Sequence, residues 1–225
     1  KAREPLQYVL GSAWFGPLEL EVGPGVFIPR PETEVMADWA VHNADGPRLV
    51  DLCTGTGALA LYLHHYLPEA QVKAVELADA ALAYTQANTR NTGVEVIQAD
   101  ATAEDTLAEW NGTVDLLVSN PPYVPEAEVP AQPEARLDPA RALYGGDAPG
   151  LRIPRAIAHR AAGLLAPGGL FAMEHHETQG PALLAALGAD RRFTGVRVHQ
   201  DLTGRDRFLT ARRSCDAVAG AEVEE

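Results

Sequence analysis

A short apolar strand runs into a glycine-rich turn in Arg48-Leu49-Val50-Asp51-Leu52-Cys53-Thr54-Gly55-Thr56-Gly57, and a helix-forming run, Ala58-Leu59-Ala60-Leu61-Tyr62-Leu63, follows at once. Glycines at a strand-to-helix turn let the backbone approach a ligand closely. The stretch therefore predicts a strand–turn–helix unit of an α/β sheet, with a ligand at the turn. The alternative is a tight turn that binds nothing.

An acid closes the next predicted strand, Val72-Lys73-Ala74-Val75-Glu76. A carboxylate in this place can accept hydrogen bonds from two ribose hydroxyls, as in nucleotide-binding βαβ units. The preceding turn lacks the G-x-G-x-x-G spacing that cradles a pyrophosphate. A nucleoside with a positive pole therefore fits the acid better than a diphosphate does. A solvated strand end is the alternative for Glu76.

A third strand end carries polar groups of another kind. Val114-Asp115-Leu116-Leu117-Val118-Ser119 is typical of a strand buried on both faces, and Asn120-Pro121-Pro122-Tyr123 stops it abruptly. The Asn120 carboxamide oxygen and the Pro121 carbonyl are acceptors that can hold a planar NH₂ group, and the Tyr123 ring can lie against its flat face. The motif indicates attack by a weakly nucleophilic, conjugated nitrogen. A proline-rich loop with a capping Asn is the alternative.

The chain as a whole alternates between strands and helices, which is typical of a doubly wound, mostly parallel sheet. A helix is expected from Glu32 to about Ala44. The last two strands have no helix between them and predict an antiparallel addition at one edge. The other expected elements are strands at 94–98, 169–174, 192–199 and 206–211, and helices at 57–67, 79–91, 103–110, 152–166 and 178–187.

Three segments stand outside this alternation. Residues 6–28, punctuated by glycines, predict a small β-hairpin. Residues 121–150 predict a long proline-rich loop, a kind of segment that is often functional. Residues 214–225 are small and acidic and predict a disordered tail. We therefore expect a hairpin and linker at 1–30, one α/β domain at 31–213 and a tail at 214–225.

Composition narrows the class of protein. The 225 residues contain no apolar run that approaches a membrane span, and the two cysteines, Cys53 and Cys215, make no disulfide framework. A cytoplasmic location is expected from this. The formal net charge of −13 opposes non-specific binding to a phosphate backbone. We therefore expect no stable nucleic-acid partner and no membrane partner.

These motifs resemble a known class of enzyme. Asp51 to Gly57, Glu76, Asp100 and Asn120 to Tyr123 are similar to the motifs of class I S-adenosylmethionine-dependent methyltransferases. More narrowly, the chain resembles the HemK/PrmC family, which methylates the side-chain amide of a glutamine in peptide chain release factors. The narrower likeness covers residues 5 to about 213 and rests on Pro5–Gly11, Phe27–Glu34, Asp138–Leu143 with Gly145-Gly146, and Glu174-His175 with Gln179-Gly180.

The resemblance implies a seven-stranded sheet preceded by a hairpin, and a role for each motif residue. Glu76 would hold the ribose hydroxyls of S-adenosylmethionine, Asp100 would accept from its adenine amine, and Phe27 and Arg30 would roof the pocket. The implied cofactor contacts are Phe27, Arg30, Asp51, Cys53, Thr54, Gly55, Thr56, Gly57, Glu76, Asp100, Ala101 and Asn120. The implied substrate contacts are Asn120, Pro121, Pro122 and Tyr123, of which Asn120, Pro121 and Tyr123 would be catalytic.

The expected chemistry is direct transfer of the methyl group from the sulfonium to the amide nitrogen, with S-adenosylhomocysteine as the product. The Asn120 oxygen and the Pro121 carbonyl would accept the two N–H bonds, and Tyr123 would clamp the amide plane. No general base is required before attack. No metal is expected, because His175-His176 has no Cys or acid at metal spacing. Glu174 is either a buried acid near the pocket or a helix cap.

The sequence departs from the family pattern in two places, and several alternative functions stay open. Cys53 stands where the family usually has glycine, and this sequence opens almost at the predicted hairpin, so we expect the helical domain that the family carries ahead of its first strands to be missing. The acceptor expected from the resemblance is a release-factor glutamine. Alternatives are an adenine amine of DNA or RNA, a ribosomal-protein glutamine, or an inactive core that only binds the cofactor.

Overall fold

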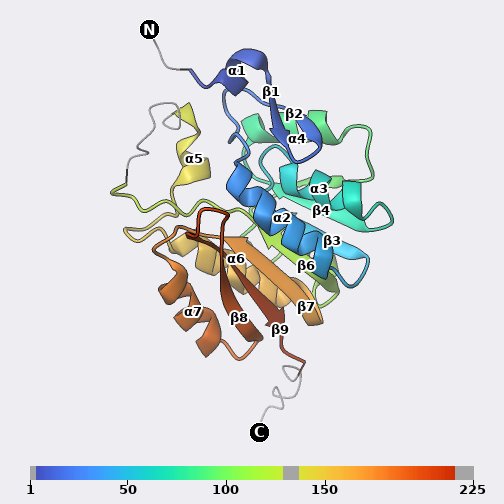
Figure 1. Ribbon diagram of the computed structural model, residues 1–225. Coiled ribbons are helices and arrows are strands. Elements are labelled where there is room, and N and C mark those ends of the chain that lie inside the picture. The colour runs from blue at the N-terminus through green and yellow to red at the C-terminus, as the bar shows by residue number, and fades with distance from the viewer. Residues whose placement is uncertain (1–3, 129–136, 216–225) are drawn as a thin grey trace, which may run out of the picture.

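The computed structural model describes residues 4–128 and 137–215, and it has a sheet with helices on both faces (Figure 1). Its elements are α1 (Leu6–Leu10), β1 (Ser12–Phe15), β2 (Leu18–Glu21), α2 (Pro31–Asn43), β3 (Arg48–Leu52), α3 (Ala58–Tyr66), β4 (Gln71–Glu76), α4 (Asp79–Thr89), β5 (Glu95–Gln98), a 3₁₀ turn η1 (Ala108–Trp110), β6 (Val114–Ser119), α5 (Ala140–Leu143), α6 (Arg152–Leu164), β7 (Leu165–Glu174), α7 (Gly180–Ala189), β8 (Phe193–Gln200) and β9 (Asp206–Arg213).

The main sheet has seven strands in the order β5-β4-β3-β6-β7-β9-β8. The pairs from β5 to β7 are parallel, and β9 is antiparallel to both of its neighbours. The predicted mostly parallel, seven-stranded sheet is confirmed. The antiparallel strand is not the outermost one, because β9 lies between β7 and β8.

The central strand β3 shows why this sequence is covered on both sides. Four of its five residues are buried, and successive side chains of a strand point to opposite faces. Leu49 packs in one apolar cluster with α2 and α3, whereas Val50 and Leu52 pack in another with α6 and α7. A continuous apolar run is therefore what a strand with helices on both faces requires.

Register brings the ends of four strands to one edge of the sheet. Leu52 of β3 is paired with Val75 of β4 on one side and with Ser119 of β6 on the other, and Glu76 is paired with Gln98 of β5. The next strand after β3 in the chain, β4, lies on one side of it, whereas β6 lies on the other. This reversal of strand order is the place where open α/β sheets bind ligands.

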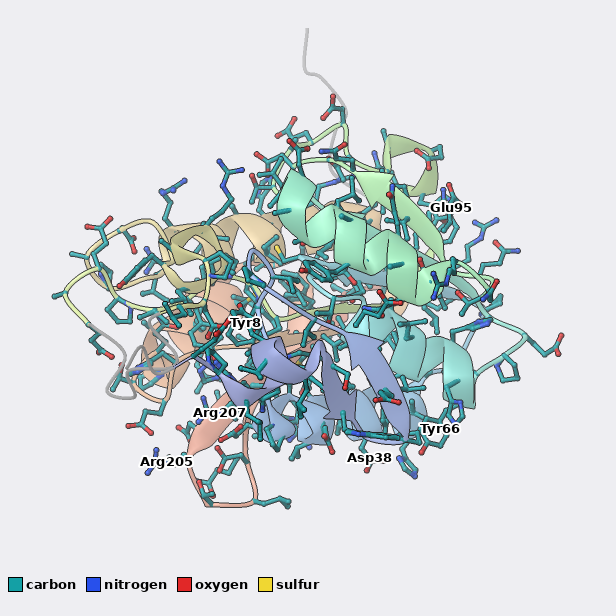
Figure 2. All side chains as sticks on the ribbon, turned by 90° about the horizontal axis from the view of Figure 1, so that it is seen from above. Tyr8, Asp38, Tyr66, Glu95, Arg205 and Arg207 are labelled. Atoms are coloured by element: carbon teal, nitrogen blue, oxygen red, sulfur yellow. The ribbon has the colours of Figure 1, made fainter. Side chains whose placement is uncertain are left out.

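A separate two-stranded sheet precedes the main one. β1 and β2 pair antiparallel, as predicted for residues 6–28. The first part of that segment is the helix α1, which the sequence did not predict. Tyr8 of α1, near the centre of Figure 2, donates its hydroxyl to the Val26 carbonyl at 2.7 Å. With Val22, Val26 and Ile28 it forms a small apolar cluster that includes Ala81 of α4, so the hairpin is packed onto the main domain.

Three expected boundaries need correction, and one prediction cannot be assessed. The helix expected at 103–110 is reduced to the short turn η1, and the helix expected to reach 166 ends at Leu164. β7 begins at Leu165 rather than 169, because its pairing with β6 shifts register between Val114 and Leu116 and so accommodates the extra residues. The tail predicted from 214 lies outside the described residues from 216 onward. The loop predicted at 121–150 is interrupted by the short helix α5, and its residues 129–136 also lie outside the described residues. Among the described residues, no helix is long and apolar enough to cross a membrane.

Candidate active site

A cavity of about 380 Å³ opens at the edge where the four strands end. Its lining combines the glycine turn after β3, the end of β4, the turn after β5, the stretch after β6, and parts of the segments 25–33 and 139–153. A volume of this size is in the usual range for small-molecule and cofactor sites. Glu76, Asp100 and Asn120, which the sequence singled out at separate strand ends, therefore line one cavity.

The turn after β3 takes backbone conformations that explain its glycines. Gly55 and Gly57 have φ values of 58° and 86°, in the left-handed region that glycine adopts without strain. Cys53 also has a positive φ, 63°, although it has a side chain. The family's usual glycine at this position is thus explained by backbone geometry. The predicted turn survives with Cys53, whose side chain packs beside the core.

Glu76, the last residue of the neighbouring strand β4, stabilises the same turn through hydrogen bonds. Its carboxylate accepts backbone N–H bonds from Gly55 at 2.9 Å, Leu77 at 3.0 Å and Ala78 at 2.7 Å. Burial raises the pKa of Glu76, and the N–H donors oppose that rise. Glu76 lines the cavity, so it is a structural acceptor for the turn as well as the predicted ribose ligand.

Asp51 lies beneath the turn rather than in the cavity lining. One oxygen, Oδ2, accepts from the Thr54 hydroxyl at 2.5 Å and from the backbone N–H of Ala60 at 3.1 Å. The other oxygen is buried and has no hydrogen-bond partner among the residues that the structure describes, and burial raises the pKa of Asp51 to about 7. Asp51 therefore ties the turn to the first residues of α3. Its predicted contact with the cofactor would act through Thr54.

The turn after β5 supplies the other predicted nucleoside contacts. Asp100 and Ala101 both line the cavity. The Asp100 Oδ1 atom accepts from the backbone N–H and the hydroxyl of Thr102, at 2.8 and 2.7 Å. Ala101 is buried and packs in the same apolar cluster as Val75. The predicted role of Asp100 toward an adenine amine is compatible with this geometry, because only one carboxylate oxygen is used in these bonds.

Phe27 and Arg30 are placed differently from each other. Phe27 lines the cavity, and the Arg30 guanidinium lies over its ring at 4.9 Å from the centroid. Arg30 then pairs with the Asp138 carboxylate at 2.5 Å. Arg30 is thus a support behind Phe27 that links the segment before α2 to the segment before α5, rather than part of the cavity lining. Gly57 is also outside the lining, because it closes the turn at the start of α3.

The stretch after β6 forms another part of the lining, with all of Asn120, Pro121, Pro122 and Tyr123 in it. The Asn120 Nδ2 atom donates to the Thr33 hydroxyl oxygen at 3.2 Å, and the Tyr123 hydroxyl donates to Glu174 at 2.7 Å. The Tyr123 carbonyl accepts from the buried Gln179 side chain at 2.8 Å. Burial and the nearby Glu174 raise the pKa of Tyr123, so the phenol keeps its proton.

Several lining or supporting residues were not predicted as site residues. Thr33, Pro29, Arg141 and Leu143 line the cavity, and the positive charge of Arg141 opposes the rise in the pKa of Glu76. Thr33 and Arg141 lie within stretches that carried the family resemblance, which was the available signal. Of the two readings of Glu174, the buried acid near the pocket is the observed one, since it is 2% exposed and bonded to Tyr123.

Comparisons with known proteins give the class of protein. A sequence profile for the methyltransferase small domain matches residues 32–137. The catalytic domain of hMettl16, solved in complex with the MAT2A 3′UTR hairpin 6, shares the fold with a TM-score of 0.66 and 14% identity, over 88% of this chain and 76% of that chain. The solved structure shows the shared fold, and the profile match together with the named sequence relatives shows that the chain is a methyltransferase.

Sequence relatives narrow the class. A release factor glutamine methyltransferase from Mycolicibacterium smegmatis is 52% identical over 94% of this chain and 75% of its own length. A 4-amino-L-phenylalanine/4-methylamino-L-phenylalanine methyltransferase from Streptomyces pristinaespiralis is 39% identical over 94% of this chain and 74% of its own length. The chain belongs to the release factor glutamine methyltransferase family, which confirms the resemblance seen in its sequence.

Proposed function

We propose that this protein transfers a methyl group from S-adenosylmethionine to the side-chain amide nitrogen of the glutamine in the Gly-Gly-Gln motif of peptide chain release factors. The observation that carries the proposal is the presence of Asn120, Pro121 and Tyr123 on the same cavity as Glu76 and the glycine turn. Family membership supports the choice of a glutamine as acceptor.

The cavity fits the proposed cofactor in volume and in the chemistry of its donors and acceptors. Glu76, Asp100 and the backbone of residues 53–56 would hold it, with Phe27 and Ala101 as apolar walls. When bound, S-adenosylmethionine supplies a methyl group on a positively charged sulfur. The carboxylates suit that charge and the ribose hydroxyls, and the turn offers no pyrophosphate cradle.

The protein's own part in the reaction is geometric. An amide nitrogen attacks poorly because its lone pair is delocalised into the carbonyl. The Asn120 Oδ1 atom and the Pro121 carbonyl would accept the two N–H bonds and stabilise the nitrogen as it becomes positive. The Tyr123 ring would hold the amide plane. Correct orientation of this kind can supply several kcal/mol of the barrier reduction.

The division into a hairpin and linker at 1–30 and a catalytic domain at 31–213 is part of the proposal, as is a cytoplasmic location. The hairpin and linker contribute to the site through Phe27, which belongs to the linker and lines the cavity. The acidic net charge of −13 supports a protein acceptor over a nucleic acid.

The test measures labelled methyl transfer from S-adenosylmethionine to four acceptors. They are a bacterial release factor, the same factor with the Gly-Gly-Gln glutamine changed to alanine, unmethylated DNA, and free 4-amino-L-phenylalanine. Label on the unchanged factor alone is the expected result. Label on DNA or on the amino acid alone would contradict the proposed acceptor. Bound cofactor with no label on any acceptor would favour an inactive core.

A further inference from the structure

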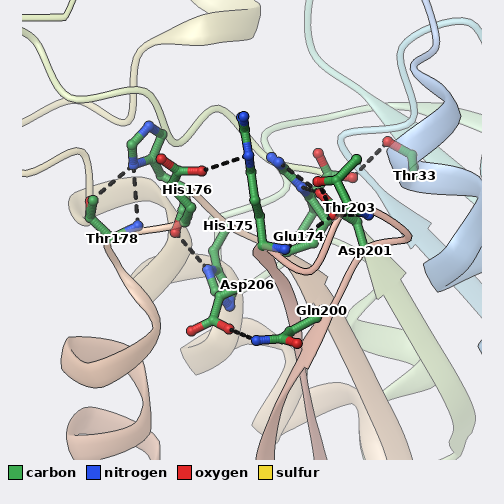
Figure 3. Close-up of polar contacts among 12 residues, drawn as sticks. Thr33, Glu174, His175, His176, Thr178, Gln200, Asp201, Thr203 and Asp206 are labelled. Carbon is green, nitrogen blue, oxygen red and sulfur yellow. Dashed lines mark hydrogen bonds and ion pairs between the residues drawn. The ribbon is translucent and has the colours of Figure 1, made fainter.

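Two side chains far apart in the sequence meet beside the acceptor motif. Thr33 lies in the first turn of α2, and Glu174 is the last residue of β7. The Thr33 hydroxyl donates to the Glu174 Oε2 atom at 2.6 Å (Figure 3). The two side chains are 4% and 2% exposed, so water competes little for these groups.

The hydrogens in this group can be counted. An ionised carboxylate only accepts hydrogen bonds, and a hydroxyl has one hydrogen to donate. Tyr123 gives its hydrogen to Oε1 of Glu174, and Thr33 gives its hydrogen to Oε2. Burial raises the pKa of Glu174, whereas the hydrogen bonds from Thr33 and Tyr123 and the positive charge of Arg207, which is paired with Asp201 at 3.1 Å, favour its ionised form. The count is made for that ionised form. Thr33 therefore has only lone pairs left to offer to Asn120.

This count fixes which way the Asn120 carboxamide points. Its NH₂ end, Nδ2, is the end that can bond to Thr33, and it does so at 3.2 Å. The reversed carboxamide would set its oxygen against the Thr33 oxygen, with no hydrogen between them. The Asn120 oxygen is thereby left for the cavity, where an incoming NH₂ group needs an acceptor.

We infer that Thr33 and Glu174 are positioning residues, which set the orientation of the Asn120 carboxamide and of the Tyr123 ring for an NH₂ acceptor. The inference rests on the proposed function for its chemistry. Neither side chain needs to touch the acceptor nitrogen or exchange a proton with it. Their contribution is to present an oxygen, rather than a second NH₂ group, to the acceptor.

The first test compares Thr33→Val, which keeps the shape and removes the hydroxyl, with Thr33→Ser, which keeps the hydroxyl. Because the valine leaves the half-buried Asn120 NH₂ group without its partner and free to turn, we expect a roughly tenfold fall in kcat. The serine variant should stay within about threefold of the wild type, since it restores the acceptor. The dissociation constant of S-adenosylhomocysteine should be unchanged in both variants. Thr210→Val is the matched control, because Thr210 is a buried threonine of β9 whose hydroxyl contacts His199 instead.

Glu174→Gln gives a second test that does not alter volume. A glutamine has one oxygen and one NH₂ group, so either Thr33 or Tyr123 must reverse its hydroxyl and accept. We expect at least a tenfold fall in kcat with an unchanged melting temperature. A wild-type rate in both Thr33→Val and Glu174→Gln would overturn the inference. So would a serine variant as slow as the valine variant.

A spectroscopic readout separates this inference from the proposed function. The side-chain ¹⁵N–¹H₂ signals of Asn120, assigned through their loss in Asn120→Asp, should exchange slowly in the wild type and Thr33→Ser. They should exchange faster in Thr33→Val, where the bond is missing. If the wild type transfers no methyl group yet these signals behave as expected, the proposed reaction fails and the positioning contact stands. Identical signals in all three proteins would refute the contact itself.

Discussion

The two sides of the cavity are held in place by different kinds of hydrogen bond. On the side of β3 and β4, carboxylates accept backbone N–H bonds: Glu76 binds three and Asp51 binds one, with Thr54 as a further donor. On the side of β6 and β7, side chains bond to side chains, through Asn120, Thr33, Glu174 and Tyr123. A backbone cradle depends on main-chain conformation, whereas a side-chain network depends on the identity of each member. The first should tolerate substitution of residues that contribute only backbone N–H groups, whereas Glu76 and every member of the side-chain network should be sensitive.

The largest expected effect comes from the side-chain network. Asn120→Asp keeps one oxygen toward the acceptor but adds a charge, and it cannot donate to Thr33 as the amide does. We expect a roughly hundredfold loss of kcat, the size seen when one oriented polar group of a reaction site is removed. Methyl-transfer kinetics with a release factor measure it.

The cofactor side should be spared by that change. S-adenosylhomocysteine should bind to Asn120→Asp within about threefold of the wild type, a small free-energy difference. A cofactor affinity that fell as far as the rate would mean that the two sides are not separate, and that Asn120 has a structural role.

Glu76→Gln tests the other side of the cavity, where a carboxylate accepts backbone N–H bonds, and it should change cofactor affinity. The amide cannot accept all three N–H bonds, and hydrogen bonds to charged groups contribute about 1.5–3 kcal/mol each. We therefore expect S-adenosylhomocysteine to bind about tenfold more weakly or worse, with a lower melting temperature. Calorimetric titration measures the affinity, and Glu69→Gln, an exposed acid after α3, is the control. Unchanged affinity would show that the turn holds its shape without Glu76.

Asp51→Asn should have a smaller effect, which is on the stability of the fold and depends on pH. The pKa of Asp51 is about 7 in the folded protein against a usual 3.8, so the folded state binds the proton more tightly than the unfolded chain does. Stability contributed by the protonated form is present below pH 4 and is lost as the pH rises toward 7. The asparagine oxygen can still accept from Thr54 and Ala60, because both donate to the same atom.

The melting temperature of Asp51→Asn minus that of the wild type should therefore increase from about pH 4 to about pH 7. Above about pH 7 this difference should stay constant. Paired thermal melts in the same buffers measure the difference, in which the other titrating groups cancel. A difference that does not change with pH would show that Asp51 keeps its charge despite burial.

The smallest expected effect lies at Cys53. A side chain at φ of 63° is strained by about 1–2 kcal/mol, and glycine is not. Cys53→Gly should be more stable than Cys53→Ala by about 1 kcal/mol, which corresponds to a few degrees in melting temperature. Comparing glycine with alanine isolates the Cβ atom, since both remove the thiol. A more stable alanine variant would mean that packing outweighs backbone strain at this turn.

The same contrast explains how much of the site the sequence could reveal. The glycine turn and Glu76 are strand ends with local signals, and sheet register brings them together without further information. The Thr33–Glu174 bond joins residues 141 positions apart, and no local pattern marks either as a partner. Arg30 was expected in the roof of the cavity, but its guanidinium forms an ion pair with Asp138, a residue of a distant segment.

The fold was predicted well where periodicity is strong and less well where segments are short. The strands β3 and β6 have the expected bounds, because their apolar runs are followed closely by Gly55 and Pro121, and β4 differs from its expected range only by starting at Gln71. The helix α1 has only five residues, too few to show a period. The start of β7 depends on a register shift against β6, which belongs to a pair of strands rather than to one sequence.

The position of β9 has a consequence for how the protein is made. A ribosome delivers β7 long before β9, yet β9 must enter the sheet between β7 and β8. Glu174 is paired with Phe208, and the backbone N–H of His175 donates to the Arg207 carbonyl at 2.9 Å. A nascent chain that has emerged only as far as β8 therefore lacks the strand that flanks Glu174. The acceptor side of the cavity can be completed only after nearly the whole described chain has left the exit tunnel, so a stalled or prematurely terminated product lacks an intact methylation site.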